Sequence, residues 1–144
     1  MSMKTLVDLL HTPGAGYTLV VKPAGASPRL FTRRGVADLM CLLTDEPATL
    51  RGALVADKVV GKAAASLMIL GGVAELHTDV ISRPALDLFS RYPGLRVSYD
   101  TVADYVVNRA GTGMCPLETR SLDIATPAGC LDAITSFINN KSNG

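Results

Sequence analysis

The spacing of apolar residues divides the first third of the chain into a short helix, two strands and a second helix. Residues 4–11 carry leucine and valine at helical spacing and end before a proline-glycine breaker. Residues 17–21 and 29–32 are rich in β-branched and aromatic side chains and flank a turn-rich gap, which predicts a hairpin. From Gly35 to Thr44, apolar residues recur at i, i+3, i+4 and i+7, so we expect an amphipathic helix there.

Beyond residue 52 the pattern alternates between short buried strands and helices. Strands are predicted over residues 53–56, 73–81 and 95–99, and helices over residues 58–70 and 84–92. Repeated β-α-β units favour a largely parallel sheet covered by helices, and the initial hairpin adds an antiparallel edge. The sequence therefore predicts a three-layer α/β/α fold with a mixed sheet of about five strands and an N-terminal hairpin.

The last third of the chain is less regular. Residues 102–107 are apolar, residues 108–113 are loop-like, and a helix start is expected at Cys115-Pro116. A final helix is predicted after Thr126-Pro127, and a polar tail follows it, so that residues 123–144 form a C-terminal helix and tail. A chain of 144 residues has no room for a second core, so we expect a single domain over residues 1–144.

Composition and charge restrict the classes of function. Apolar residues make up 48% of the chain and charged residues 19%, which is typical of a globular protein with a buried core. The net charge of +1 gives no electrostatic argument for binding nucleic acid or a membrane. Three widely spaced cysteines and the lack of a signal sequence favour a cytoplasmic location. Folding requires no cofactor at this length, and so apolar a chain could form a homodimer.

The first candidate site lies in residues 56–63, where a strand is expected to lead into a helix. Strand ends and helix N-termini converge at such a junction, and their unpaired N–H groups can hold a ligand. Asp57 and Lys58 are adjacent opposite charges there, and Gly61 and Lys62 follow them. A phosphate-binding P-loop would need a glycine at position 56 and a hydroxyl at position 63, and both residues are alanine. The alternative is structural: Asp57 caps the helix, and Gly61 and the alanines that follow let it approach the sheet.

The second candidate site is Cys115, which precedes Pro116 at a predicted helix start. Cys115 would then be the N-cap, and Glu118 at N3 could reach back as half of a capping box. The positive end of the helix dipole favours a thiolate, which allows a nucleophile or a modification site, although Glu118 opposes the effect. The other interpretation is a small N-cap residue without chemistry. Papain-like catalysis would also need a histidine, and nothing in the sequence brings His11 or His77 to Cys115.

Other polar groups give weaker signals. His77 and Asp79 share one face of a predicted strand, but no zinc-binding spacing accompanies them, so we expect no metal site. Four basic residues gather around the hairpin, at Lys22, Arg29, Arg33 and Arg34. They could face a phosphate near the helix that begins at Gly35, or they could form a solvated rim.

Two segments, Asp57-Lys58-Val59-Val60-Gly61-Lys62-Ala63-Ala64-Ala65 and Cys115-Pro116-Leu117-Glu118, together resemble the domain-of-unknown-function 1893 family. The resemblance runs over residues 17–122. That family has no assigned activity and is placed in the cytidine deaminase-like fold, so the resemblance implies this fold. Zinc deaminases need His-x-Glu or Cys-x-Glu at one helix start and Pro-Cys-x-x-Cys at the next. By the order of elements these motifs would fall near residues 34–36 and 57–59, which contain no cysteine or histidine. The sequence therefore argues against a zinc-dependent deaminase.

The leading hypothesis is a deaminase-like domain without the zinc site that binds a small molecule, a nucleotide or nucleoside, in the cleft between two helix starts. The residues predicted to bind the ligand are Gly35, Asp57, Lys58, Gly61, Lys62, Cys115 and Glu118. Two alternatives stay open. One is an enzyme that uses Cys115 as a nucleophile or redox group, with Asp57 and Lys58 assisting. The other is a regulatory module that binds other proteins.

Overall fold

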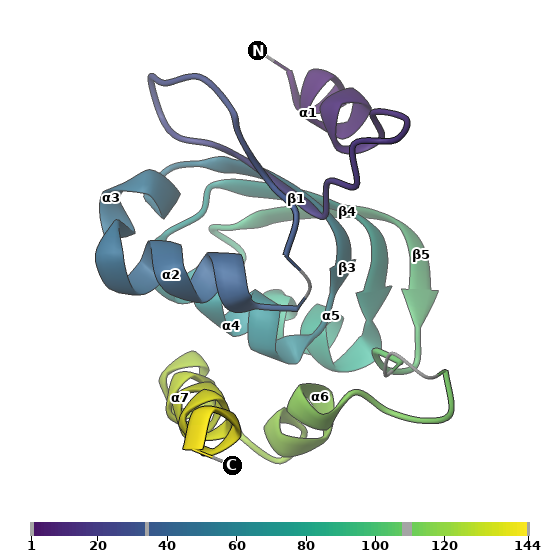
Figure 1. The fold of residues 1–144 in the computed structure, drawn as a ribbon, viewed down its shortest axis with the longest axis vertical. Coiled ribbons are helices and arrows are strands. Elements are labelled where there is room, and N and C mark those ends of the chain that lie inside the picture. The colour runs from purple at the N-terminus through teal and green to yellow at the C-terminus, as the bar shows by residue number, and fades with distance from the viewer. Residues whose placement is uncertain (1, 34, 108–110, 144) are drawn as a thin grey trace.

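The computed structural model describes residues 2–33, 35–107 and 111–143, and in these residues an open sheet carries helices on both faces (Figure 1). The strands are β1 (Leu19–Lys22), β2 (Arg29–Phe31), β3 (Leu54–Val60), β4 (Glu75–Ser82) and β5 (Arg96–Ala103). The helices are α1 (Met3–Leu10), α2 (Ala37–Asp45), α3 (Pro47–Leu50), α4 (Lys62–Gly71), α5 (Arg83–Ser90), α6 (Pro116–Ser121) and α7 (Pro127–Asn143). The three-layer α/β/α fold class predicted from the sequence is confirmed.

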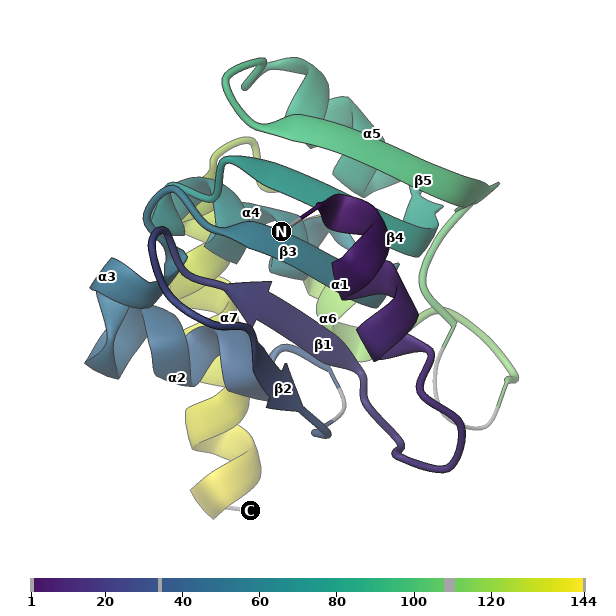
Figure 2. The ribbon, with the colours of Figure 1, turned by 90° about the horizontal axis from the view of Figure 1, so that it is seen from above.

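The sheet is mixed, with the strand order β2-β1-β3-β4-β5 (Figure 2). Strand β1 runs antiparallel to both β2 and β3, whereas β3, β4 and β5 are parallel to one another. The hairpin therefore forms one edge of the sheet, as its β-branched and aromatic residues predict. Because β3, β4 and β5 are parallel, their carboxyl ends lie at the same edge, and the segments that follow them meet there.

Helix α1 covers one face of the sheet by packing on β1 and β3, and the remaining helices lie on the other side (Figures 1 and 2). A small cluster of apolar side chains, which includes Leu6, Leu10, Val20 and Ala56, lies under α1. The larger core lies between the other face of the sheet and helices α2, α4 and α5. Helix α7 packs against α4 and α6, so the C-terminal part of the chain is joined to the core through α4.

Helix α4 is the central helix of the larger core, and small residues let its neighbours approach it. Ala63, Ala64 and Ala65 are all buried in its first turns. At its end, a Cβ atom added to Gly71 would lie 2.7 Å from the Leu50 side chain, so only glycine fits against α3 without a shift. Helix α4 is thus apolar on most of its surface because protein surrounds it on most sides.

The boundary between β3 and α4 differs from the sequence prediction. The sequence places the start of the helix at Lys58, but β3 continues to Val60 and α4 begins at Lys62, with Gly61 as its N-cap. Val59 and Val60 are β-branched, and such side chains suit a pleated strand better than a helix. Asp57 therefore lies inside a strand, and the interpretation that it caps the helix is wrong.

Three other boundaries also differ. Helix α2 begins at Ala37, because Gly35 is in a turn with a positive φ of 70°. The helix predicted to end at Thr44 continues to Asp45, and Pro47 then opens the short helix α3, where proline fits the first turn. Most of the predicted polar tail is helical, since α7 continues to Asn143. Residues 108–110, part of the predicted loop, lie outside the described residues.

Candidate functional site

A cavity of about 930 Å³ opens at the carboxyl ends of β3, β4 and β5, between the starts of α2 and α4 and the helices α6 and α7. Much of its wall is apolar, with side chains such as Val59, Val80 and Phe137. The polar groups in the wall include Asp57 and Lys58 of the first predicted motif and Cys115 of the second. The fold thus brings the two motifs to one cavity from segments that are more than fifty residues apart.

Asp57 is one of three buried acidic residues that line this cavity, together with Asp38 and Glu118. It occupies a position in β3 opposite Leu19 of β1 and Thr78 of β4, and it is 9% exposed. Burial raises the pKa of the Asp57 carboxyl to about 7, although the backbone N–H groups of Lys58 and Val59 donate to it and favour the charged form. The nearby charge of Asp79 raises the pKa further. At neutral pH the carboxyl is therefore present in both its protonated and its ionised form.

Glu118 does not form the local capping box that the sequence predicts. Its carboxylate instead accepts hydrogen bonds from the backbone N–H of Lys62 and from that of Val106, each at 2.9 Å. The side chain is 2% exposed. Glu118 thus caps the N-terminus of α4 from a position 56 residues away, and it ties that helix to the segment that follows β5.

Gly61 and Lys62 complete this arrangement at the start of α4. A Cβ atom on Gly61 would lie 2.8 Å from Oε2 of Glu118 and 2.7 Å from Cγ2 of Val106, so the close approach requires glycine. The Lys62 side chain is 6% exposed, and its Nζ donates to the carbonyl of Leu122 at 3.1 Å. These residues line the cavity, but their polar groups are largely engaged within the protein.

Cys115 is the N-cap of α6, and Pro116 is in the first turn, as the sequence predicts. Its thiol makes no capping hydrogen bond, and its backbone N–H donates to the carbonyl of Val106 at 2.6 Å. The residue is half-buried and lines the same cavity as Asp57. Neither His11 nor His77 lines the cavity in the described part of the chain, so no histidine is placed beside the thiol.

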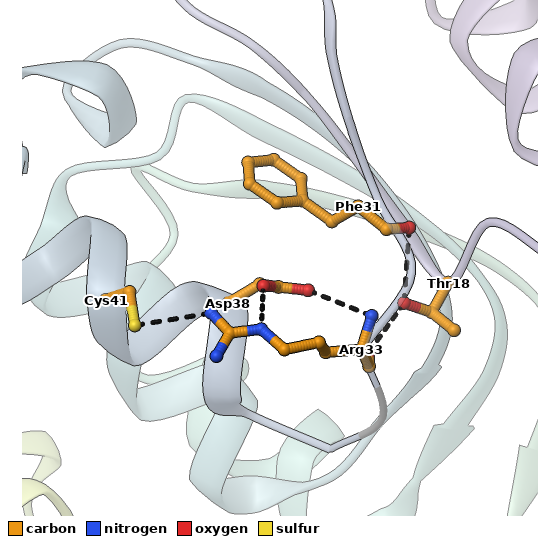
Figure 3. Close-up of polar contacts among 5 residues, drawn as sticks. All are labelled: Thr18, Phe31, Arg33, Asp38 and Cys41. Atoms are coloured by element: carbon orange, nitrogen blue, oxygen red, sulfur yellow. Dashed lines mark hydrogen bonds and ion pairs between the residues drawn. The ribbon is translucent and has the colours of Figure 1, made fainter.

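Two of the three described basic residues around the hairpin pair with acidic residues, while Lys22 donates to the carbonyl of Pro23 at 3.3 Å. The guanidinium of Arg33 donates to the Asp38 carboxylate at 2.6 Å and to the Cys41 sulfur at 3.3 Å. The Thr18 hydroxyl donates to the backbone carbonyl of Arg33 (Figure 3). The contacts with Cys41 and Asp38 raise the pKa of Arg33. Arg29 pairs with Glu46 at 3.1 Å. Arg34 lies outside the described residues. Asp38 and Glu46 thus offset the positive charges of Arg33 and Arg29, so the surface around the hairpin is less positive than the sequence suggests.

On the other face of the sheet, a third ionisable residue joins the pair of His77 and Asp79, for which the sequence predicts no metal site. His77, Asp79 and Asp100 bring one potential metal ligand each to within 4.8 Å of one another. The spacing of His77 and Asp79 along a predicted strand is visible in the sequence, but Asp100 joins them through the pairing of β4 with β5. The starts of α2 and α4, residues 35–38 and 61–64, contain no histidine or cysteine, so a deaminase-type zinc site has no ligands there.

Comparison with known proteins now places the chain in a family. The family model described as a domain of unknown function, DUF1893, matches residues 6–138. This chain belongs to the DUF1893 family. The crystal structure of a DUF1893 family protein from Thermotoga maritima is 30% identical in sequence, covers 93% of this chain and 88% of that chain, and has a TM-score of 0.82. The family assignment made from the two motifs is therefore confirmed. A search of curated proteins found no match.

Membership of DUF1893 establishes the open mixed sheet but assigns no activity, so any function must come from the site itself. Within the described residues, no helix is both long enough and apolar enough to cross a membrane.

Proposed function

We propose that this protein binds a small molecule in the cavity at the carboxyl ends of β3 and β4, that a nucleoside is the ligand class, and that the fold is cytidine deaminase-like. The order of elements, a helix, a hairpin and then alternating α/β units, supports the fold assignment. The observation that carries the ligand proposal is the buried Asp57 in the wall of a cavity of about 930 Å³. Apolar cavities with a few polar groups at the carboxyl ends of parallel strands are typical ligand sites.

The charges around the cavity favour a nucleoside over a nucleotide. A phosphate would need free N–H groups at the start of α4, but the N–H of Lys62 already donates to the Glu118 carboxylate. The Nζ of Lys62 donates to a backbone carbonyl, and Arg33 is paired with Asp38. Lys58 is a further cation in the wall, but the other cations are engaged and Glu118 adds a negative charge, so an uncharged ligand fits the site better than a phosphate.

Asp57 supplies the polar recognition in this proposal. With a pKa of about 7, its carboxyl can donate a hydrogen bond when protonated and accept hydrogen bonds when ionised. The polar edge of a nucleobase presents donors and acceptors side by side, and enzymes that bind a single base use such hydrogen bonds together with apolar side chains. Val59, Val80 and Phe137 provide the apolar surface against which the flat base can lie.

Isothermal titration calorimetry with the common nucleosides and their monophosphates tests this function. At least one nucleoside should bind, its monophosphate should bind more weakly, and Asp57→Asn should lower the affinity at least tenfold. Asp8→Asn, the same chemical change at an exposed position of α1, is the matched control and should leave the affinity unchanged. Absence of binding across the panel, or equal binding by Asp57→Asn, would remove the proposal.

A cysteine-dependent enzyme is the second candidate, because Cys115, Asp57 and Lys58 line one cavity. The rate of alkylation by iodoacetamide, followed by peptide mass spectrometry, separates it from a binding protein. The measurement is made in a Cys41→Ser background, since Cys41 is exposed, and the buried Cys130 serves as the unreactive reference. An enzyme of this kind predicts that Cys115 reacts at pH 7 much faster than an ordinary thiol, and an ordinary rate excludes it.

A further inference from the structure

On the face of the sheet that carries α1, strands β4 and β5 bring together His77, Asp79 and Asp100. His77 and Asp79 are two residues apart in β4 and so point to the same side of the sheet. Ser98 of β5 is the register partner of His77, and Asp100 lies two positions further along β5. We propose that His77, Asp79 and Asp100 bind a divalent transition-metal ion at this position, on the opposite face from the cavity.

The distances fit a metal site after small side-chain movements. Nε2 of His77 lies 3.5 Å from Oδ1 of Asp100. Two ligands that bind a tetrahedral zinc ion at about 2.1 Å are about 3.4 Å apart. The ligand atom of Asp79 lies within 4.8 Å of both, so the proposed site requires this carboxylate to move closer to the other two ligands. The fold thus gathers one imidazole and two carboxylates in one place on the sheet.

The orientation of His77 is an independent observation that points to a metal. Its Nδ1 forms a hydrogen bond of 2.8 Å with the hydroxyl of Ser98, while Nε2 faces Asp100. The side chain is 16% exposed, so the imidazole is held in place by the protein. Histidines that bind metals usually have the second ring nitrogen fixed by such a hydrogen bond, which sets the tautomer and directs the free nitrogen to the ion.

The charges also call for a cation. Asp79 and Asp100 lie opposite each other in adjacent strands, and like charges in this arrangement destabilise a sheet, so a bound cation would relieve their repulsion. His11, which follows α1, contacts the Asp79 carboxylate at 3.0 Å from outside this set of three ligands. Imidazole combined with carboxylates suits Zn²⁺, Co²⁺ or Mn²⁺ rather than the all-oxygen sites of Mg²⁺ and Ca²⁺. The alternative is that the two histidines contact the two aspartates directly, with no metal ion between them.

A metal titration of tag-free protein distinguishes these two states. Zn²⁺ binding is measured by competition with a chromophoric chelator, and Co²⁺ binding by its absorption spectrum. We expect one ion per chain, at least 100-fold weaker affinity in His77→Gln and in Asp79→Asn, and a 10- to 100-fold loss in Ser98→Ala. Glu75→Gln is the matched control because Glu75 lies on the same face of β4 but pairs with Arg96.

The chain contains two histidines, which gives a second measurement that needs no variant. In a ¹H–¹⁵N spectrum of the imidazoles, Zn²⁺ should shift the ring nitrogens of His77 at one equivalent. Failure of the wild-type protein to bind Zn²⁺ or Co²⁺ would overturn the proposal. Unchanged affinity in the His77 and Asp79 variants, or an unshifted His77 signal at saturation, would overturn it as well.

Discussion

The raised pKa of Asp57 predicts a specific dependence of stability on pH. The folded protein holds the Asp57 proton up to a pH of about 7, whereas an ordinary aspartate loses it near pH 3.8. The folded state therefore binds this proton more tightly than the unfolded state, and the stability that it provides is complete below pH 3.8 and lost as the pH rises through about 7. At about 1.36 kcal/mol per pH unit, the total loss is about 4 kcal/mol.

Urea denaturation of the wild-type protein and Asp57→Asn between pH 5 and 8 measures this contribution. The amide keeps an oxygen for the N–H groups of Lys58 and Val59 but has no charge to desolvate. The free energy of unfolding of the wild type should fall by about 2.5 kcal/mol relative to the variant across this range, and the variant should be the more stable protein at pH 8. Asp8→Asn should follow the wild type. A difference between wild type and Asp57→Asn that stays constant with pH, or that changes in the opposite direction, would refute the reasoning.

The interior contacts of α4 allow three further tests by urea denaturation. Glu118→Gln removes the negative charge that accepts hydrogen bonds from the N–H groups of Lys62 and Val106, so the free energy of unfolding should fall by about 2 kcal/mol. A fall below about 0.5 kcal/mol would contradict the capping role. Gly61→Ala places a methyl group 2.8 Å from Oε2 of Glu118 and should lower the free energy of unfolding by about 1–3 kcal/mol. An unchanged free energy would mean that the start of α4 and Glu118 are not in close contact. Leu50→Ala truncates a fully buried side chain and should cost about 2–5 kcal/mol, and a smaller loss would show that α3 is loosely packed.

The order of elements could be predicted from the sequence because each element has a local signal. Alternation between β-branched segments and helical periodicity gave the parallel units, and the turn-rich gap gave the hairpin. The start of α4 was predicted four residues too early, because the valines at 59 and 60 stand at helical spacing from the alanines at 63 and 64, although their β-branched side chains favour a strand. Gly61, rather than the charges at 57 and 58, marks the boundary.

The candidate site was predictable as a set of residues but not as a set of contacts. Asp57 and Cys115 line one cavity, as the two motifs suggested. The partners of Glu118 could not be inferred, since a Glu at N3 has a local partner in the usual capping box, whereas here Lys62 comes from a distant segment. The cluster around His77 likewise depends on the register between β4 and β5, which no local pattern encodes.

The capping of α4 by Glu118 also sets an order for the maturation of the newly synthesised chain. Residue 118 leaves the ribosome 56 residues after Lys62, which at about 5–20 residues per second corresponds to a delay of roughly 3 to 11 seconds. During this interval the first turn of the central helix has no carboxylate to complete it, and Gly61 is not yet enclosed. The start of α4 is therefore completed late in synthesis, once α6 has been made and Glu118 accepts the hydrogen bond from Lys62.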